Sequence, residues 1–130
     1  MSADDTNGDY LLDTSFLIHL LYEKDDAVTL HSDIRGREVI STVALYELHK
    51  GSNFDLGEFE EMYVVGFCPE GAEAAGEIWR SLKSNGEPIG SMDTVIDGIA
   101  LHRNLTVVTD NTKRFERIDG LSVRGYRDRS

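Results

Sequence analysis

The sequence predicts an α/β fold with a central, mostly parallel β-sheet flanked by helices. Short apolar segments rich in β-branched residues alternate along the chain with longer segments whose apolar residues recur at helical spacing. This alternation is typical of strands that are connected through helices and therefore run parallel. The chain has 130 residues, which is enough for one hydrophobic core and too short for two. We therefore expect one domain over residues 9–130, preceded by a flexible polar tail at residues 1–8.

The elements expected from this pattern follow one another closely. The expected strands span residues 10–12, 38–40, 62–67, 105–108 and 121–123. The expected helices span residues 14–23, 25–35, 42–50, 71–84 and 91–103, with a helical turn at 111–117. Ser41 or Thr42 is a suitable N-cap for the third helix and Gly51 a suitable residue just after its end, while Ser91 is expected to cap the fifth.

Composition restricts the class of protein. The single cysteine, Cys68, excludes an internal disulfide and a multi-cysteine metal site. The first ten residues lack the basic start and apolar stretch of a signal peptide, and the apolar run at residues 16–21 is too short to span a bilayer. We therefore expect a soluble, cytoplasmic protein with no membrane partner.

The charge is strongly negative but unevenly distributed. The net charge is −11, with −14 on residues 1–112 and +3 on residues 113–130. An acidic total usually argues against nucleic-acid binding, whereas the basic C-terminal segment leaves it open. A carboxylate-rich metal site would explain part of the acidity. Adaptation to high salt is a second hypothesis, because only four of the 13 basic residues are lysine.

Two acidic residues have both a structural and a chemical interpretation. Asp13 directly follows the first expected strand, where the sites of open α/β sheets form, but it would also cap the next helix. Glu47 lies beside the buried face of its helix, but it could simply pair with Lys50 three residues later. For either residue alone, the structural interpretation is the simpler one.

Asp93 and Asp97 are four residues apart and therefore share one face of the expected helix 91–103. Asp93 falls in the first turn, where the helix dipole favours a negative charge. Asp97 falls in the middle of the helix among apolar residues, where a carboxylate is costly unless it is solvated or paired. Two like charges on one face repel unless a cation or a proton lies between them.

The segment Thr109, Asp110, Asn111 follows the expected strand 105–108. Asn111 is a good N-cap for the following turn, and the alternative is that Asn111 or Asp110 lies at the rim of the same crevice as Asp13. Strand ends and helix starts can converge at one edge of a parallel sheet. A cluster of carboxylates there requires a hard divalent cation, and oxygen ligands favour Mg²⁺ or Mn²⁺ over Zn²⁺.

The order of these segments resembles the PIN domains, and among them the VapC ribonuclease toxins of type II toxin–antitoxin systems. The resemblance is carried by residues 11–15, 47–51, 89–100 and 107–115, and it extends over about residues 9–126. There are three departures. Asn111 stands in place of a fourth acid, Asp97 stands where a small apolar residue is usual, and residues 51–66 form a short stretch.

The resemblance implies a PIN-like fold and a metal-dependent endoribonuclease. The implied catalytic residues and metal ligands are Asp13, Glu47 and Asp93. Further candidate ligands are Asn111, Asp97 and Asp110. One or two Mg²⁺ or Mn²⁺ ions at these residues would activate a water molecule that attacks an RNA phosphodiester.

Other residues receive supporting roles by the same resemblance. Thr14, Ser15 and Thr109 would orient the carboxylates. Lys113, Arg114 and Arg117 would contact RNA phosphates, although solubility explains these three equally well. The implied partners are a structured RNA (tRNA or rRNA), a small antitoxin protein and a second copy of the chain. Tyr22, Phe59 and Trp79 are candidates for an apolar patch or for the core.

Three other functions remain open at this stage. The chain could be a PIN nuclease of RNA processing or decay, which shares the chemistry but not the antitoxin. It could be a catalytically decayed PIN scaffold, to which Asn111 points slightly. A phosphoacceptor receiver domain is disfavoured, because Ile40 is followed by Ser41 and Thr42 rather than by an aspartate.

Overall fold

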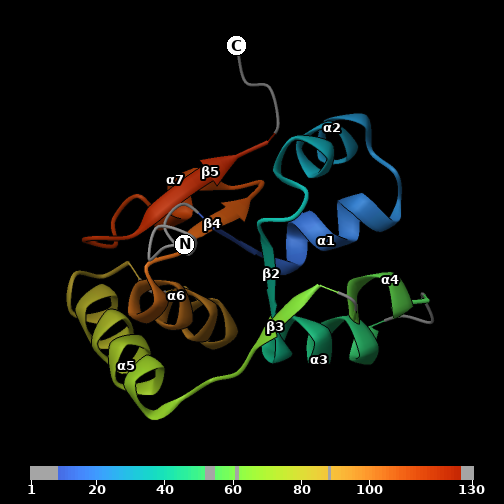
Figure 1. Cartoon of the computed structure of the whole chain (residues 1–130). Coiled ribbons are helices and arrows are strands. Elements are labelled where there is room, and N and C mark those ends of the chain that lie inside the picture. The colour runs from blue at the N-terminus through green and yellow to red at the C-terminus, as the bar shows by residue number, and fades with distance from the viewer. Residues whose placement is uncertain (1–8, 52–54, 61, 88, 127–130) are drawn as a thin grey trace.

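A computed structural model describes residues 9–51, 55–60, 62–87 and 89–126, and it contains one sheet of five parallel strands (Figure 1). The strands are β1 (Tyr10–Leu12), β2 (Glu38–Ser41), β3 (Tyr63–Val65), β4 (Thr106–Thr109) and β5 (Ser122–Gly125). Their order across the sheet is β3-β2-β1-β4-β5, and every neighbouring pair is parallel. The predicted fold class is confirmed.

Helices cover both faces of this sheet (Figure 1). The helices are α1 (Thr14–Leu21), α2 (Asp25–Ile34), α3 (Thr42–Gly51), α4 (Gly57–Glu60), α5 (Pro69–Ser84), α6 (Ser91–Arg103) and α7 (Thr112–Phe115). The first four pack on one face, and α6, backed by α5, packs on the other. No helix in the described part of the chain has both the length and the apolar character needed to cross a membrane.

Successive residues of the central strands face opposite cores, as strand geometry requires. Leu11 and Val107 belong to the core that contains Ile96 and Ile99 of α6. The next residues along the same strands, Leu12 and Val108, belong to the core that contains Phe16 and Leu17 of α1. Both faces are therefore buried, which is why these strands are apolar throughout rather than alternating with polar residues.

The strand order determines where a crevice for a functional site forms. The chain proceeds from β1 to β2 on one side and later returns to β4 on the other side of β1. In such sheets the crevice forms at the carboxyl ends of the two strands where the order reverses. Leu12 pairs with Val108 in the register of β1 and β4, so Asp13 and Thr109 are neighbours at this edge.

Most predicted elements are present, with differences at their ends. The predicted cap Ser41 is confirmed, because its hydroxyl accepts from the N–H of Ala44 at 3.0 Å. The prediction for Ser91 is wrong: it is the first helical residue of α6, and the cap is Gly90, which has no side chain to donate or accept. Gly51 is likewise the last residue of α3 rather than the residue beyond it.

Two further differences concern the middle of the chain. Helix α4 was not predicted. Helix α5 starts at Pro69, two residues earlier than expected, because the Cys68 sulfur accepts from the N–H of Gly71 at 3.4 Å and proline suits the first helical position. The polar tail expected at residues 1–8 lies outside the described residues.

Helices α5 and α6 approach each other very closely at Gly98. A Cβ atom on Gly98 would lie 2.6 Å from the carbonyl oxygen of Gly71 and 2.7 Å from the Cβ of Ala75. Real Cβ atoms essentially never make contacts this short, and the obstructing atoms include backbone. Glycine at position 98 is therefore what lets α6 lie against α5, and the contact fixes the position of α6 on the sheet.

We expect Gly98→Ala to lower the free energy of unfolding by about 1–3 kcal/mol, the range typical of overpacking. Gly76→Ala in α5 is the matched control. Its added Cβ would meet only the end of the Arg80 side chain at 3.7 Å, so helix propensity should raise stability by about 0.5–1 kcal/mol. Urea unfolding followed by circular dichroism measures both, and a neutral Gly98→Ala would contradict the tight contact.

Candidate metal centre

Asp13 is held rigidly at the carboxyl end of β1. Its Oδ1 accepts from the N–H of Thr14 at 2.9 Å, which caps α1. Its Oδ2 accepts from the hydroxyl of Ser15 at 3.2 Å and from that of Thr109 at 2.9 Å. The side chain is almost fully buried. Both interpretations of Asp13 are therefore met, since it caps a helix and also faces the crevice between β1 and β4.

The environment of Asp13 disfavours its charged form. Burial raises the pKa of this carboxyl to about 6, from an ordinary value of 3.8. The hydrogen bond from Thr109 opposes the rise, and the negative charge of Asp93 adds to it. Asp93, which belongs to the first turn of α6, is thus close enough to repel Asp13.

Asp97 lies in the same cluster and is fully buried. Neither of its carboxylate oxygens has a hydrogen-bond partner among the described residues. Burial, followed by the charges of Asp13 and Asp93, raises its pKa to about 8, and Arg114 partly opposes this. The structure thus brings together the three aspartates that the sequence placed at a strand end and on one helix face.

Asp93 pairs with a positively charged side chain. Its Oδ2 accepts a hydrogen bond from the guanidinium of Arg114 of α7. The predicted contact of Arg114 with RNA phosphates stays a prediction. Among the charges that act on Asp97, Arg114 is the positive one.

Glu47 is attached to the cluster through a hydroxyl. The Oγ1 of Thr14 donates to Glu47 Oε1 at 2.6 Å, which links α3 to the residue next to Asp13. Lys50, the alternative partner of Glu47, lies over the ring of Tyr46, with its Nζ 5.2 Å from the ring centroid. The contact with Thr14, rather than an ion pair along the helix, accounts for the position of Glu47.

The loop after β4 closes the site from one side. Asn111 is exposed, and its Oδ1 accepts from the N–H of Arg114 at 3.4 Å, so it caps α7 as one interpretation predicted. The N–H of Asp110 donates to the hydroxyl of Ser15 at 3.5 Å. A metal-binding role for Asn111 or Asp110 stays a prediction.

The other basic residues of this region differ in their surroundings. Arg117 pairs with Glu87 at 3.4 Å, whereas Lys113 is exposed on α7. Among the apolar-patch candidates, Phe59 is buried in the core, while Tyr22 and Trp79 are exposed.

The family model of the PIN domain matches residues 10–121 of this chain. The chain belongs to the PIN domain family. A relative from Shigella flexneri, named tRNA(fMet)-specific endonuclease VapC, is 31% identical over 128 residues, which cover 90% of this chain and 97% of the relative. The predicted resemblance to VapC is confirmed, and a receiver domain is excluded.

Solved structures agree with this assignment. The DNA-bound VapBC of Salmonella typhimurium is 27% identical, with a TM-score of 0.82 over 92% of this PIN domain and 99% of that chain. VapBC2 of Rickettsia felis, bound to a DNA fragment from its promoter, is 25% identical, with a TM-score of 0.81 over 91% of this chain and 98% of that one. The PIN-like fold predicted from the sequence is confirmed.

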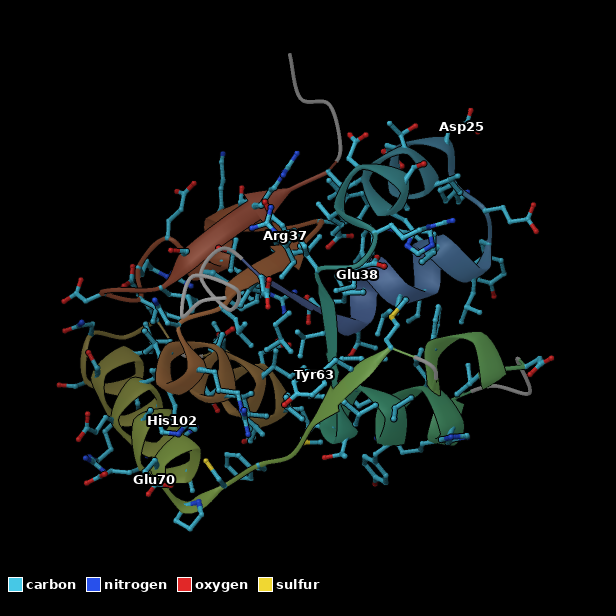
Figure 2. All side chains as sticks on the ribbon, viewed as in Figure 1. Asp25, Arg37, Glu38, Tyr63, Glu70 and His102 are labelled. Atoms are coloured by element: carbon cyan, nitrogen blue, oxygen red, sulfur yellow. The ribbon has the colours of Figure 1, made fainter. Side chains whose placement is uncertain are left out.

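A second group of ligand-type residues lies elsewhere on this PIN domain. The ligand atoms of Cys68, Glu70 and His102 all lie within 4.8 Å of one another, and Figure 2 shows Glu70 and His102 together where α5 begins and α6 ends. Hydrogen bonds from its own backbone and from Cys68, and then the charge of His102, lower the pKa of Glu70. These contacts explain why the three side chains lie close together. Sequence analysis missed it, because nothing in the sequence links His102 to Cys68.

By the same distance criterion, the described carboxylates of the aspartate cluster do not form a closed group of three. A cation bound among them would therefore have to draw them together.

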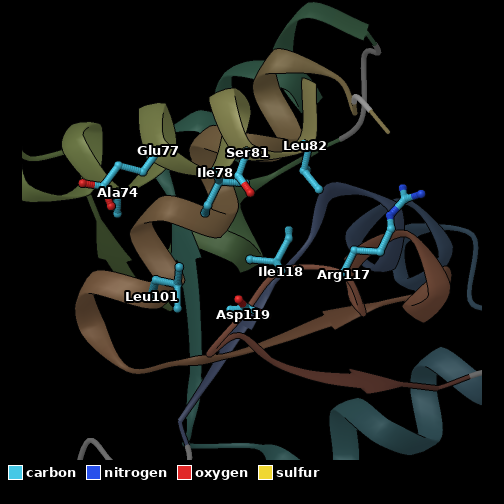
Figure 3. A pocket seen from close by; sticks show the side chains of 9 residues that line it. All are labelled: Ala74, Glu77, Ile78, Ser81, Leu82, Leu101, Arg117, Ile118 and Asp119. Carbon is cyan, nitrogen blue, oxygen red and sulfur yellow. The ribbon is translucent and has the colours of Figure 1, made fainter. Parts of the chain in front are cut away.

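A separate pocket of about 180 Å³ lies between α5, Leu101 and the segment after α7 (Figure 3). Of the predicted site residues it contains only Arg117, so it is not where the acids act.

The raised pKa values predict how the metal-free protein responds to pH. In the folded state Asp97 and Asp13 keep protons that the unfolded chain loses near pH 4, so the folded state binds more protons between pH 4 and about 8. Their contribution to the free energy of unfolding therefore falls as pH rises through this interval. We expect Asp97→Asn, which never acquires the charge, to gain stability relative to the wild type from pH 4 to 8.

Urea unfolding in chelator at several pH values measures this difference. Glu73→Gln, which changes an exposed carboxylate of α5, is the control and should follow the wild type. If the free energy of unfolding changes with pH in the same way for the wild type and Asp97→Asn, the Asp97 carboxyl has the same pKa in the folded and unfolded states.

Proposed function

We propose that this PIN domain is a metal-dependent endoribonuclease of the VapC toxin type that hydrolyses a phosphodiester bond in a structured RNA. One observation carries the proposal. Three aspartates from two separate segments meet at the carboxyl edge of the sheet, and Glu47 is joined to them through Thr14. Such a gathering of carboxylates is unfavourable for folding by itself, which supports a role in binding a cation.

The residues present fit a hard divalent ion. The donors are all carboxylate oxygens, and the charges of Asp13 and Asp93 repel each other. The two oxygens of Asp97 are buried without a hydrogen-bond partner in the described part of the chain. Asp13, Glu47 and Asp93 are the proposed ligands. A bound Mg²⁺ or Mn²⁺ would supply the Lewis acidity that activates water and stabilises negative charge on the phosphate.

The chain itself positions these groups. The hydroxyls of Ser15 and Thr109 orient the Asp13 carboxylate, and the hydroxyl of Thr14 orients Glu47. Arg114 pairs with Asp93. Its planar guanidinium would also suit an RNA phosphate if a bound cation balanced the charge of Asp93. Lys113, on the exposed side of α7, is placed to contact a flanking phosphate.

The proposed substrate class and partner come from relatives. The Shigella relative is named for cleavage of tRNA(fMet), so initiator tRNA is the substrate to test first. The Salmonella and Rickettsia structures are VapBC complexes, and we propose a small antitoxin protein as partner of this chain as well.

We expect cleavage of initiator tRNA to require Mg²⁺ or Mn²⁺ and to fall by about 100-fold or more in Asp93→Ala. The loss should exceed the 10- to 100-fold effect of residues that merely orient ligands, because a ligand is removed. Rates are measured with each metal and with chelator, and Glu73→Gln is the control for the loss of a carboxylate that lies outside the site.

Cleavage that persists in chelator or in Asp93→Ala would contradict the metallonuclease proposal. If a folded protein binds no metal and cleaves no RNA, a non-catalytic scaffold is the better function. Induced expression in bacteria separates a toxin from a processing nuclease: growth arrest by the wild type, absent in Asp93→Ala, is expected of a toxin.

Arg114→Gln tests the proposed contact with an RNA phosphate. We expect it to weaken RNA binding and to reduce the slope of log affinity against log salt by about 1, as loss of one phosphate contact requires. Binding is measured with Ca²⁺ in place of Mg²⁺ to suppress cleavage. Arg80→Gln, which removes an exposed arginine of α5 outside the site, is the matched control. An unchanged salt slope in Arg114→Gln would restrict Arg114 to its pair with Asp93.

A further inference from the structure

We propose that Asp97 is an additional ligand of the metal centre, binding a divalent cation directly together with Asp13 and Asp93. The inference rests on the proposed function, since it presupposes a cation at this edge of the sheet. It goes beyond the set of Asp13, Glu47 and Asp93 by assigning a role to a carboxylate on the second turn of α6.

The described chain satisfies neither the ionised nor the protonated form of the Asp97 side chain. Asp97 is 0% exposed, and both of its oxygens lack a hydrogen-bond partner there. An ionised carboxylate would need donors, and a protonated one would need an acceptor for its O–H. Buried polar groups in native proteins are nearly always satisfied, so we infer that a group other than the described residues satisfies this carboxylate.

Four threonine and serine hydroxyls of α1, β4 and α6 donate to groups other than Asp97. Those of Ser15 and Thr109 donate to Asp13, and that of Thr14 donates to Glu47. The hydroxyl of Thr94, on α6 itself, donates to the carbonyl oxygen of Ser91 at 2.7 Å. None of these four hydroxyls donates to Asp97, and the guanidinium of Arg114 bonds to Asp93.

The charge around the Asp97 carboxylate also favours a cation. The charged groups that act on Asp97 are Asp13, Asp93 and Arg114. Two of the three are acids, and the guanidinium of Arg114 bonds to Asp93. The surroundings of Asp97 are thus net negative, and a cation is the complement that would reduce both its burial cost and its repulsion.

The packing of α6 prevents Asp97 from turning to solvent. Its neighbour Gly98 is pressed against Gly71 and Ala75 of α5, while Ile96 and Ile99 are buried against the sheet. Helix α6 is therefore held from two sides, and it cannot roll to expose position 97. The carboxylate stays at the edge where Asp13 lies.

The expected ligand is a hard divalent cation, Mg²⁺ or Mn²⁺, because the donors are all oxygens. Asp93 and Asp97 are one helical turn apart, so one face of α6 presents two carboxylates to the ion. Asn111, which stands in place of a fourth acid, uses its side-chain oxygen to cap α7. Asp97 restores the carboxylate charge that Asn111 lacks.

The test is titration of the chelator-treated protein with Mn²⁺ by calorimetry, for the wild type, Asp97→Asn, Asp97→Ala and Asp93→Ala. We expect both Asp97 variants to bind Mn²⁺ about 10-fold or more weakly, and to show a smaller rise in melting temperature with Mn²⁺. Glu73→Gln should match the wild type. Melting curves without metal show whether each variant is folded.

A second readout separates a direct ligand from a nearby charge. Terbium luminescence lifetimes in H₂O and D₂O count the water molecules on a bound ion, and Asp97→Ala, which removes the ligand oxygens, should carry at least one more than the wild type. Wild-type Mn²⁺ affinity within twofold in a folded Asp97→Ala, or an unchanged water count, would overturn the inference and leave the proposed function intact. No Mn²⁺ binding by the wild type would overturn both.

Discussion

The hydrogen bond from Thr109 to Asp13 joins residues 96 positions apart, and the architecture of the site depends on it. It ties the end of β4 to the end of β1, next to the backbone bond from the N–H of Asp13 to the carbonyl oxygen of Val108. It also points Asp13 into the crevice while the same residue caps α1. The loop that leads to α7, and hence the position of Arg114, follows from where β4 ends.

The two hydrophobic cores on opposite faces of the sheet stabilise the fold and offset the unfavourable free energy of the carboxylate cluster. The apolar residues of β1 and β4 are buried on both faces, and the hydrophobic effect supplies the dominant favourable free energy of the fold. The cluster of Asp13, Asp93 and Asp97 opposes folding through desolvation and repulsion. Concentrating such local strain at one edge of an otherwise well-packed domain is typical of functional sites.

The sequence was sufficient to predict the parallel sheet and the closeness of Asp13 and Asp93. Local patterns of apolar residues predict the strands and helices, and in a parallel sheet the ends of the strands lie at one edge. It could not predict that Arg114 pairs with Asp93, since the two lie on different helices and nothing local links them. The start of α5 was missed for a related reason. A cysteine is an unusual cap, and the contact between Cys68 and Gly71 is visible only in three dimensions. Roles for Asn111 and Asp110 as ligands stay predictions.

The close contact of α5 and α6 also has a consequence for how this chain can diverge. A side chain at position 98 would need space that Ala75 and the backbone at Gly71 now occupy. Substitutions at these positions are therefore coupled, and a lineage that gained a larger residue at one of them would have to respace the two helices at the same time. Such respacing would move α6 and with it Asp93 and Asp97. Sequence drift at this contact between α5 and α6 would thus be limited by its effect on the carboxylates.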